Sequence, residues 1–249
     1  GQEIMGNGYG EFAEVYDLLT FNVPYDGLAD YYSEILTRFG ADGARVLDMG
    51  CGTGSLTVRL SERGFDMIGQ DASSEMLTIA ADKSSKIMWI CQDMEKTELG
   101  GTVGAVISTL DSINHLGSPD AILECFRRAA ECLNSGGLFA FDVNTIFKHR
   151  EILGNNTFVY DVDGVYCVWQ NAFDECDNGV DIELDLFLEN EDGSYSRGGE
   201  SFREIALTTD AYCKLLENSG FEVGNVWEYQ TFGAPSENSE KLLILAKKR

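Results

Sequence analysis

The stretch Val46-Leu47-Asp48-Met49-Gly50-Cys51-Gly52-Thr53-Gly54 places three glycines within five positions, directly behind a short apolar run. Glycine-rich turns that follow a buried strand commonly bind phosphate, because their N–H groups can come close to an anion. Here the turn is preceded by Asp48, a carboxylate that would repel a pyrophosphate. The loop therefore calls for a ligand other than a simple phosphate ester.

Two common phosphate-binding loops do not match this stretch. The dinucleotide fingerprint G-x-G-x-x-G requires a glycine at position 55, where the chain has Ser55. A Walker loop requires Gly-Lys-Ser/Thr after the glycines, and no such sequence follows. A nicotinamide-dependent oxidoreductase thus remains only as a minor alternative.

The chain around this loop alternates between two kinds of pattern. Helical spacing is found at 25–39 and 55–63, after the N-cap residue Ser73, and from Ser118-Pro119 to a stop at 134–137. Apolar runs typical of buried strands cover 44–47, 65–69, 87–91, 103–109 and 138–143. A helix at 209–219 and strands at 221–231 and 241–246 follow later. This alternation predicts an α/β fold with a largely parallel sheet that is covered on both faces.

The segment from about 156 to 207 has a different pattern. Within 180–189, the apolar residues at even positions alternate with acidic residues at every odd position except Phe187, which is the period of a half-buried strand. Asp163-Gly164, Asn178-Gly179 and Asp192-Gly193 are hairpin turn signals. We therefore predict a small antiparallel β-sheet at 151–207, inserted into a domain made of 1–150 and 208–249.

Acidic residues follow four successive strands of the predicted parallel sheet. They are Asp48, Asp71, Asp93 and Asp111. Ligands of open parallel sheets bind beyond the carboxyl ends of the strands. A single aspartate there could simply cap a helix, but four of them beside a glycine loop favour a polyhydroxylated, cationic ligand over one rich in phosphate.

The loop at 46–54 resembles the first motif, hydrophobic-D-x-G-x-G-x-G, of class I S-adenosylmethionine-dependent methyltransferases. The resemblance implies a Rossmann-like sheet of seven strands, parallel except for one strand near the C-terminus. It also implies S-adenosylmethionine as cofactor and S-adenosylhomocysteine as product. Asp71 matches the acid that holds the ribose, and Asp93 the acid that meets the adenine amino group. The cofactor-binding residues implied in this way are Asp48, Gly50, Cys51, Gly52, Gly54, Asp71, Ala72, Met76, Asp93, Met94 and Leu110.

Within this class, the chain more closely resembles bacterial small-molecule methyltransferases with an antiparallel sheet inserted after the fifth strand. Amino-sugar N-methyltransferases and, more distantly, glycine N-methyltransferase share this plan, in which the inserted sheet covers the active site. Residues 12–17 resemble the opening helix of that group, which folds over the cofactor. The resemblance implies in-line displacement of the methyl group onto a small-molecule acceptor, with amine nitrogen favoured and hydroxyl oxygen as the alternative.

Candidate catalytic and substrate residues are few. His115 follows the fourth strand near the expected methyl position, so it is a candidate base and substrate contact, although it could equally satisfy a backbone carbonyl. Tyr16 is a second candidate that could line the pocket or lie in the core, and Asn144 is a candidate substrate contact. His149, in Phe147-Lys148-His149-Arg150, is expected in an exposed helix with a structural role. No compact His/Asp/Glu cluster is visible in the sequence, so we expect no metal.

Overall charge narrows the choice of partners. Forty-two acidic against 18 basic residues give a net charge of −24, which argues against nucleic acid and anionic membrane surfaces. Seven scattered cysteines without a C-x-x-C pair and the absence of a secretory pattern favour a cytoplasmic protein. Residues 156–207 include 13 acidic residues, which form either a solvated face or a surface that selects a cationic acceptor. The apolar face of the inserted sheet could form a homodimer contact. A non-catalytic protein that only binds the cofactor is the second functional alternative.

Overall fold

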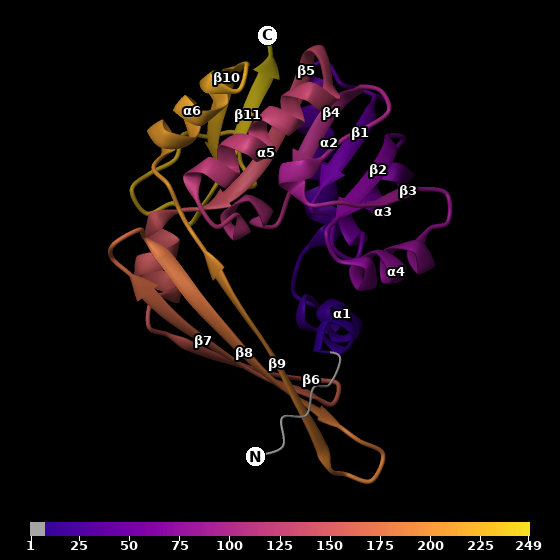
Figure 1. Cartoon of the computed structure of the whole chain (residues 1–249), viewed down its shortest axis with the longest axis vertical. Helices are drawn as coiled ribbons and strands as arrows, with labels where there is room; N and C mark the ends of the chain where they lie inside the picture. The colour runs from indigo at the N-terminus through magenta and orange to yellow at the C-terminus, as the bar shows by residue number, and fades with distance from the viewer. Residues whose placement is uncertain (1–7) are drawn as a thin grey trace.

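The computed structural model describes the backbone of residues 8–249 and the side chains of residue 13 and residues 15–249. Two sheets make up the fold, with the larger one at the top of Figure 1 and the smaller one below it. The larger sheet contains seven strands in the order β10-β11-β5-β4-β1-β2-β3. Only β11 runs antiparallel to its neighbours. The predicted fold class is therefore confirmed.

The strands of the larger sheet agree closely with the apolar runs of the sequence. They are β1 (Arg45–Met49), β2 (Asp66–Asp71), β3 (Met88–Cys91), β4 (Val103–Ser108), β5 (Leu133–Asn144), β10 (Phe221–Glu228) and β11 (Lys241–Lys248). Val46 and Leu47 are both fully buried although they belong to the hydrophobic clusters on opposite sides of the sheet. A strand covered on both faces needs apolar residues at consecutive positions, which explains the absence of alternation.

Helices cover both faces of this sheet. They are α2 (Tyr25–Arg38), α3 (Ser55–Glu62), α4 (Ser74–Lys83), α5 (Pro119–Cys132) and α6 (Thr209–Asn218). The predicted caps are confirmed, since the hydroxyls of Ser73 and Ser118 accept hydrogen bonds from the N–H groups of Met76 (3.2 Å) and Ala121 (3.1 Å). The predicted break at 134–137 differs, because these residues form an irregular part of β5 rather than a turn before it.

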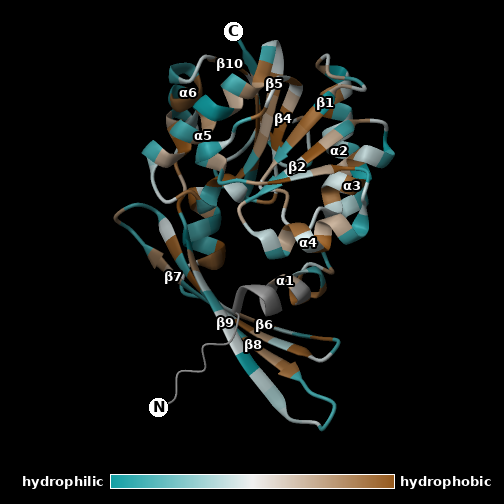
Figure 2. Ribbon diagram, turned by 45° about the vertical axis from the view of Figure 1, so that its right-hand side comes forward, coloured by the Kyte–Doolittle hydropathy of each residue, from teal (hydrophilic) through white to brown (hydrophobic). Residues whose placement is uncertain are grey.

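The smaller sheet consists of four antiparallel strands. They are β6 (Thr157–Val162), β7 (Val165–Asp174), β8 (Gly179–Glu189) and β9 (Tyr195–Glu204). Strand β8 alternates buried and more exposed residues along most of its length, and Figure 2 shows both hydrophobic and hydrophilic segments in this sheet. Its apolar face packs against Val15 of α1 (Gly8–Leu19) and Leu153 of η3 (Lys148–Leu153). Val15 and Leu153 thus cover part of that face within the chain.

Asn114, in the short helix η2 (Ser112–His115), ties both ends of the inserted segment together. Its side-chain amide donates hydrogen bonds to the carbonyls of Asn144 (3.1 Å) and Ile205 (2.9 Å). The N–H of Asn144 returns a bond to the Asn114 side chain (2.9 Å), and the N–H of Ile205 bonds the Asn114 carbonyl (2.8 Å). The chain therefore leaves and re-enters the larger domain at one fully buried side chain.

Within residues 8–249, no helix is both long and apolar enough to cross a membrane.

Candidate active site

The glycine loop between β1 and α3 has a backbone that other residues would strain. Gly50, Gly52 and Gly54 all have positive φ values, 78°, 57° and 77°. The N–H groups of Gly50 and Cys51 both donate to the carbonyl of Gln70 at 2.8 Å, which fastens the loop to the next strand. A Cβ atom on Gly50 would lie 2.8 Å from the hydroxyl oxygen of Ser112. Glycine is therefore required both by conformation and by the close approach of η2.

Asp48 is a buried acid at the base of this loop. One carboxylate oxygen accepts a hydrogen bond from the Thr57 hydroxyl at 2.8 Å, and the other has no partner among the described residues. Burial raises the pKa of Asp48 to about 7, against the opposing Thr57 bond and with a further contribution from the charge of Asp71. A cation bound beside the loop would favour the ionised form of Asp48.

Asp71, at the end of β2, holds the loop from the side. Its two carboxylate oxygens accept hydrogen bonds from the N–H groups of Gly52 and Ser73, both at 2.9 Å. Each oxygen keeps a free lone pair for a ligand hydroxyl. Asp93 follows β3, and its carboxylate lies 3.7 Å from the Lys96 ammonium. The carbonyl of Ala72 accepts a weak bond from the Cys91 thiol at 3.5 Å.

The end of β4 carries two consecutive residues in the left-handed region. Leu110 and Asp111 have φ values of 54° and 55°, which is unfavourable for side chains with a Cβ atom. The carboxylate of Asp142, fully buried on β5, accepts hydrogen bonds from both N–H groups, at 2.8 and 2.7 Å. It also accepts one from the Tyr32 hydroxyl at 2.7 Å. Asp142 therefore holds the strained turn in place.

Asp142 did not appear among the predicted site residues, although a signal existed. It lies near the carboxyl end of the fifth strand, where the rule that selected the four other aspartates also applies. Lys241 was missed as well. Its ammonium lies 3.6 Å from Asp111 and 3.4 Å from Asp142. Burial favours the neutral amine, but the charges of Asp142 and Asp111 prevail and hold the pKa of Lys241 well above its usual value.

Glu204, at the end of β9, joins this group from the inserted sheet. It is 3% exposed, and it accepts a hydrogen bond from the side-chain amide of Asn144 at 3.2 Å. Burial and the charge of Asp111 raise the pKa of Glu204 well above its usual value, so the protonated acid can donate to Asp111. Burial would also raise the pKa of Asp111, but Lys241 and His115 outweigh it and hold that pKa far below its usual range. Asn144 thus supports an acid rather than lining the cavity beyond it.

His115 completes the cluster. Its Nε2 atom lies 3.7 Å from a carboxylate oxygen of Asp111, and its ring lies 5.1 Å from that of Phe202. The potential ligand atoms of Asp111, His115 and Glu204 are all within 4.8 Å of one another. The expectation that no compact cluster of this kind exists was therefore wrong, because Glu204 arrives from a segment far along the chain.

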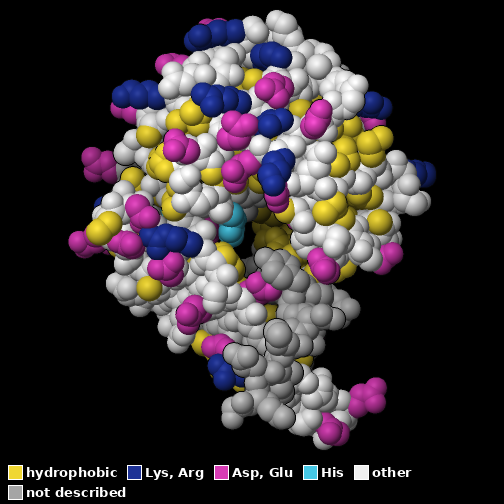
Figure 3. All heavy atoms as spheres, viewed as in Figure 1, with side chains coloured by type: hydrophobic (Ala, Val, Ile, Leu, Met, Phe, Trp, Pro, Cys, Tyr) yellow, Lys and Arg dark blue, Asp and Glu magenta, His cyan; other side chains and the backbone are white. Residues whose placement is uncertain are grey.

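Two cavities meet at the turn after β4. A cavity of about 40 Å³ is bounded by Gly50, Cys51 and Gly52, and a larger one of about 490 Å³ lies between the larger domain and the inserted sheet. Tyr16 and Leu110 line both of them. Figure 3 shows a hollow between the two parts of the molecule, with a histidine at its rim and hydrophobic side chains inside.

The remaining predicted residues lie at different places. Met76 and His115 line the larger cavity. Met94 packs under the loop, since its sulfur would lie 3.3 Å from a Cβ atom on Gly50. Gly54 lines neither of these cavities. A Cβ atom there would lie 2.6 Å from the Trp89 ring, so this glycine serves close packing.

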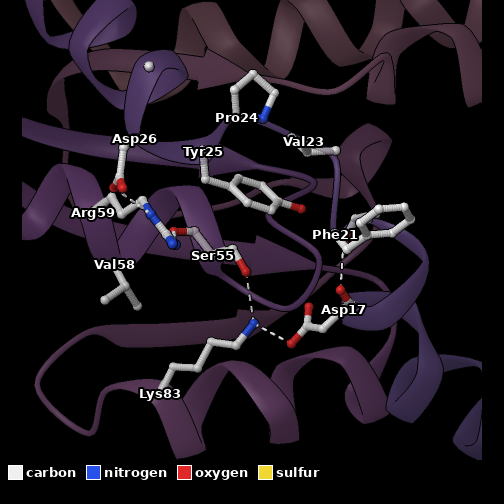
Figure 4. Close-up of a pocket in the computed structure, with 12 residues that line it drawn as sticks. Asp17, Phe21, Val23, Pro24, Tyr25, Asp26, Ser55, Val58, Arg59 and Lys83 are labelled. Atoms are coloured by element: carbon white, nitrogen blue, oxygen red, sulfur yellow. Dashed lines mark hydrogen bonds and ion pairs between the residues drawn. The ribbon is translucent and has the colours of Figure 1, made fainter. Parts of the chain in front are cut away.

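Lys83, which the sequence did not single out, connects α1 to the loop. Its ammonium lies 2.6 Å from the carboxylate of Asp17 and donates to the hydroxyls of Ser55 (2.8 Å) and Thr53 (3.1 Å). Thr53 in turn donates to Asp17 at 2.6 Å. Figure 4 shows Lys83 pointing toward Ser55 and Asp17 across one side of an open cavity of about 620 Å³. The end of α1 is thus fixed beside the loop.

His149 differs from the prediction in its exposure. It is fully buried, and its Nδ1 atom lies 2.8 Å from the Asn178 carbonyl in the turn before β8. Burial lowers the pKa of His149. The ring therefore connects η3 to the inserted sheet, which agrees with a structural role but not with an exposed helix.

Comparison with known proteins identifies the family. A family model described as "Methyltransferase domain" matches residues 46–137. YqeM of Bacillus subtilis, a predicted methyltransferase, is 33% identical over 244 residues, which is 96% of this chain and 97% of that protein. An S-adenosylmethionine-dependent methyltransferase from Clostridium acetobutylicum has 28% identity and a TM-score of 0.86, and the match covers 97% of this chain and 99% of the other.

A third similarity concerns the fold alone. The sugar N-methyltransferase KedS8 from Streptoalloteichus has 19% identity and a TM-score of 0.81, with 100% of this chain and 97% of the other covered. KedS8 and this chain share the same fold despite their low sequence identity. Taken with the glycine loop, the acids that follow the strands and the extensive similarity to YqeM, these matches show that the chain belongs to the class I S-adenosylmethionine-dependent methyltransferases.

Proposed function

We propose that this enzyme methylates the nitrogen of a small-molecule amine. The observation that carries the proposal is the negative charge around the cavity of about 490 Å³ between the larger domain and the inserted sheet, which is the larger of the two that meet after β4. The carboxylates of Asp111 and Glu200 line it beside the protonated Glu204, and His115 is the only basic side chain among its described lining residues. Behind them, Lys241 provides one positive charge for the two carboxylates of Asp111 and Asp142. The surplus negative charge favours an acceptor that arrives as an ammonium ion.

The loop residues fit S-adenosylmethionine, whose charged groups include a sulfonium and an ammonium. Asp48 has a buried carboxylate oxygen without a partner among the described residues, and its charged form would gain from a nearby cation. Asp71 has lone pairs left for the ribose hydroxyls, and the glycines leave the backbone accessible. When bound, the cofactor supplies an electrophilic methyl group on a positively charged sulfur.

The protein contributes chiefly by positioning and by excluding water. Leu110 and Asp111 are held rigidly by Asp142 at the junction of the two cavities, where donor and acceptor would meet. The inserted sheet and the segment after α1 cover the acceptor side of this junction. An amine held in the larger cavity would thus lie beside this junction, shielded from bulk water.

His115 is the residue that we assign to proton removal. An ammonium ion has no lone pair, so it must lose a proton before it can attack the methyl group. Because Asp111 lies beside Nε2 of His115, the imidazole can keep its N–H on that side and accept a proton at Nδ1. KedS8 carries out sugar N-methylation, by its description, on a similar fold, which supports nitrogen over oxygen as the acceptor atom.

The test is an acceptor screen read by release of S-adenosylhomocysteine, with amines, amino sugars, carboxylic acids and phenols compared at equal concentration. We expect turnover only with amines. The variant His115→Ala should lose about 10²-fold in kcat/KM at pH 7. The loss should shrink at pH values near the pKa of the amine itself, where the acceptor is already deprotonated.

Binding of the cofactor without turnover on any acceptor would contradict the proposal and favour a non-catalytic binding protein. Turnover restricted to phenols or carboxylic acids would instead indicate oxygen as the acceptor atom. Calorimetric titration of the cofactor into the His115 variant provides the control, because its affinity should not change.

A further inference from the structure

We propose that the acceptor amine is carried by an apolar body without phosphate, and that Glu200 is the residue that selects it. This inference rests on the proposed amine methylation and specifies its substrate class. The site is the cavity of about 490 Å³ between the end of β4, the segment after α1 and the inward face of the inserted sheet.

The first observation is the sign of the charge around this cavity. Its described lining residues include three acids but no lysine or arginine. None of residues 15–24, some of which border it, is basic either. An acceptor with a phosphate or diphosphate would therefore place its negative charges beside Asp111 and Glu200, with no lysine or arginine of the described cavity wall to pair with.

The second observation is that the arginines of the inserted sheet form their ion pairs outside the cavity. Arg203 forms ion pairs with Asp174, Asp177 and Asp181, and Arg197 forms one with Asp185. None of these residues lines the cavity. The arginines of the sheet are thus engaged with acids away from the cavity, and neither of them pairs with Glu200.

Glu200 is the inward-facing acid that we expect to bind the ammonium group of the acceptor. It lies opposite Leu184 in the β8–β9 register, two residues before the cavity-lining Phe202, so it belongs to the inward face. Among the described residues it has no hydrogen-bond or ion-pair partner. Partial burial raises the pKa of Glu200, consistent with a half-buried carboxyl group at the cavity wall. A bound ammonium ion would provide the missing partner.

The third observation is that the rest of the cavity wall is largely aromatic and apolar. Tyr160 and Trp169, whose ring centroids lie 6.3 Å apart, line the cavity together with Phe202. The indole N–H of Trp169 already donates to the Asn171 side chain at 2.7 Å, so the ring offers the cavity mainly an apolar surface. Such a wall suits a hydrocarbon or aromatic body and can also stabilise a cation over its rings.

The experiment compares three acceptors that differ in what carries the amine: 2-phenylethylamine, O-phosphoethanolamine and a nucleoside-diphosphate-linked amino sugar. We expect kcat/KM to be at least about 100-fold higher for 2-phenylethylamine than for either phosphorylated acceptor. The variant Glu200→Gln should raise KM for 2-phenylethylamine about 5- to 20-fold, with little change in kcat. Cofactor affinity should be unchanged.

Glu183→Gln is the matched control, because Glu183 is an exposed acid on the neighbouring strand β8 that does not line the cavity. It should leave all three acceptors unaffected. Glu200→Lys should reverse the preference and raise kcat/KM for O-phosphoethanolamine relative to 2-phenylethylamine.

Preference of the native enzyme for the nucleotide-linked amino sugar, with no effect of Glu200→Gln, would overturn this inference and leave amine methylation intact. Failure of all amines despite normal cofactor binding would overturn the proposed function itself. The two failures are therefore distinguishable in the same set of assays.

Discussion

The cofactor side and the acceptor side of this enzyme are built in opposite ways. On the cofactor side, carboxylates are bound to backbone N–H groups, as Asp71 is to Gly52 and Asp142 is to Leu110. On the acceptor side, the wall consists of side chains that contact one another or the cavity, and Glu200 has no described partner. A site fastened through the backbone fixes one ligand geometry, whereas a wall of side chains can be changed one residue at a time.

Asp142 is the point where the two sides meet, so its removal gives the largest expected effect. Asp142→Ala would leave two N–H groups and the Tyr32 hydroxyl without their acceptor and Lys241 with only part of its counter-charge. We expect a loss of about 3–5 kcal/mol in the free energy of unfolding, measured by urea denaturation. A loss below about 1 kcal/mol would show that the turn after β4 does not depend on this carboxylate.

Asp48 tests whether its buried carboxylate destabilises the folded protein when no cofactor is bound. Its pKa of about 7 in the folded protein lies above the ordinary aspartate value of 3.8, so in this pH range the folded state retains a proton that the unfolded state releases. Stability should therefore fall as the pH rises from about 4 to 7 and should level off above that, by about 4 kcal/mol at most.

Asp48→Asn should remove this fall and make the cofactor-free protein more stable than the native enzyme at pH 8, while weakening cofactor binding. Thermal unfolding between pH 5 and 8 checks this expectation. Parallel pH profiles of the two proteins would contradict it, since they would mean that Asp48 does not titrate in this range.

Asp71→Ala tests the cofactor side alone, and we expect it to have a smaller effect than the two changes above. Asp71→Ala should leave buried cofactor hydroxyls unpaired, at a cost of about 1–3 kcal/mol, and weaken cofactor affinity roughly 5- to 150-fold. Calorimetric titration measures this directly. Glu200→Gln serves as the counterpart, because it should alter acceptor KM without altering cofactor affinity. Equal effects of Asp71→Ala and Glu200→Gln on cofactor affinity would contradict the separation of the cofactor side from the acceptor side.

The same contrast explains what could be predicted from the sequence. The loop and the acids that follow β1 to β4 are local features, because strand order places their carboxyl ends at one edge. The acceptor wall depends on segments far apart in the chain, so nothing in the sequence indicated that Glu204 would meet Asp111. Lys241 likewise reaches Asp111 only through the antiparallel pairing of β11 with β5. His149 was misplaced because its local sequence is basic, whereas tertiary packing buries it.

Asn114 has a consequence for how such enzymes diversify. Since the entry at Asn144 and the exit at Ile205 are bound to the same side chain, both ends of the inserted sheet join the larger domain at one place. Another β-sheet grafted between these two residues would leave the backbone around the methyl donor undisturbed. Evolution, or a chimera made in the laboratory, can thus exchange the acceptor specificity of the enzyme without redesigning its chemistry.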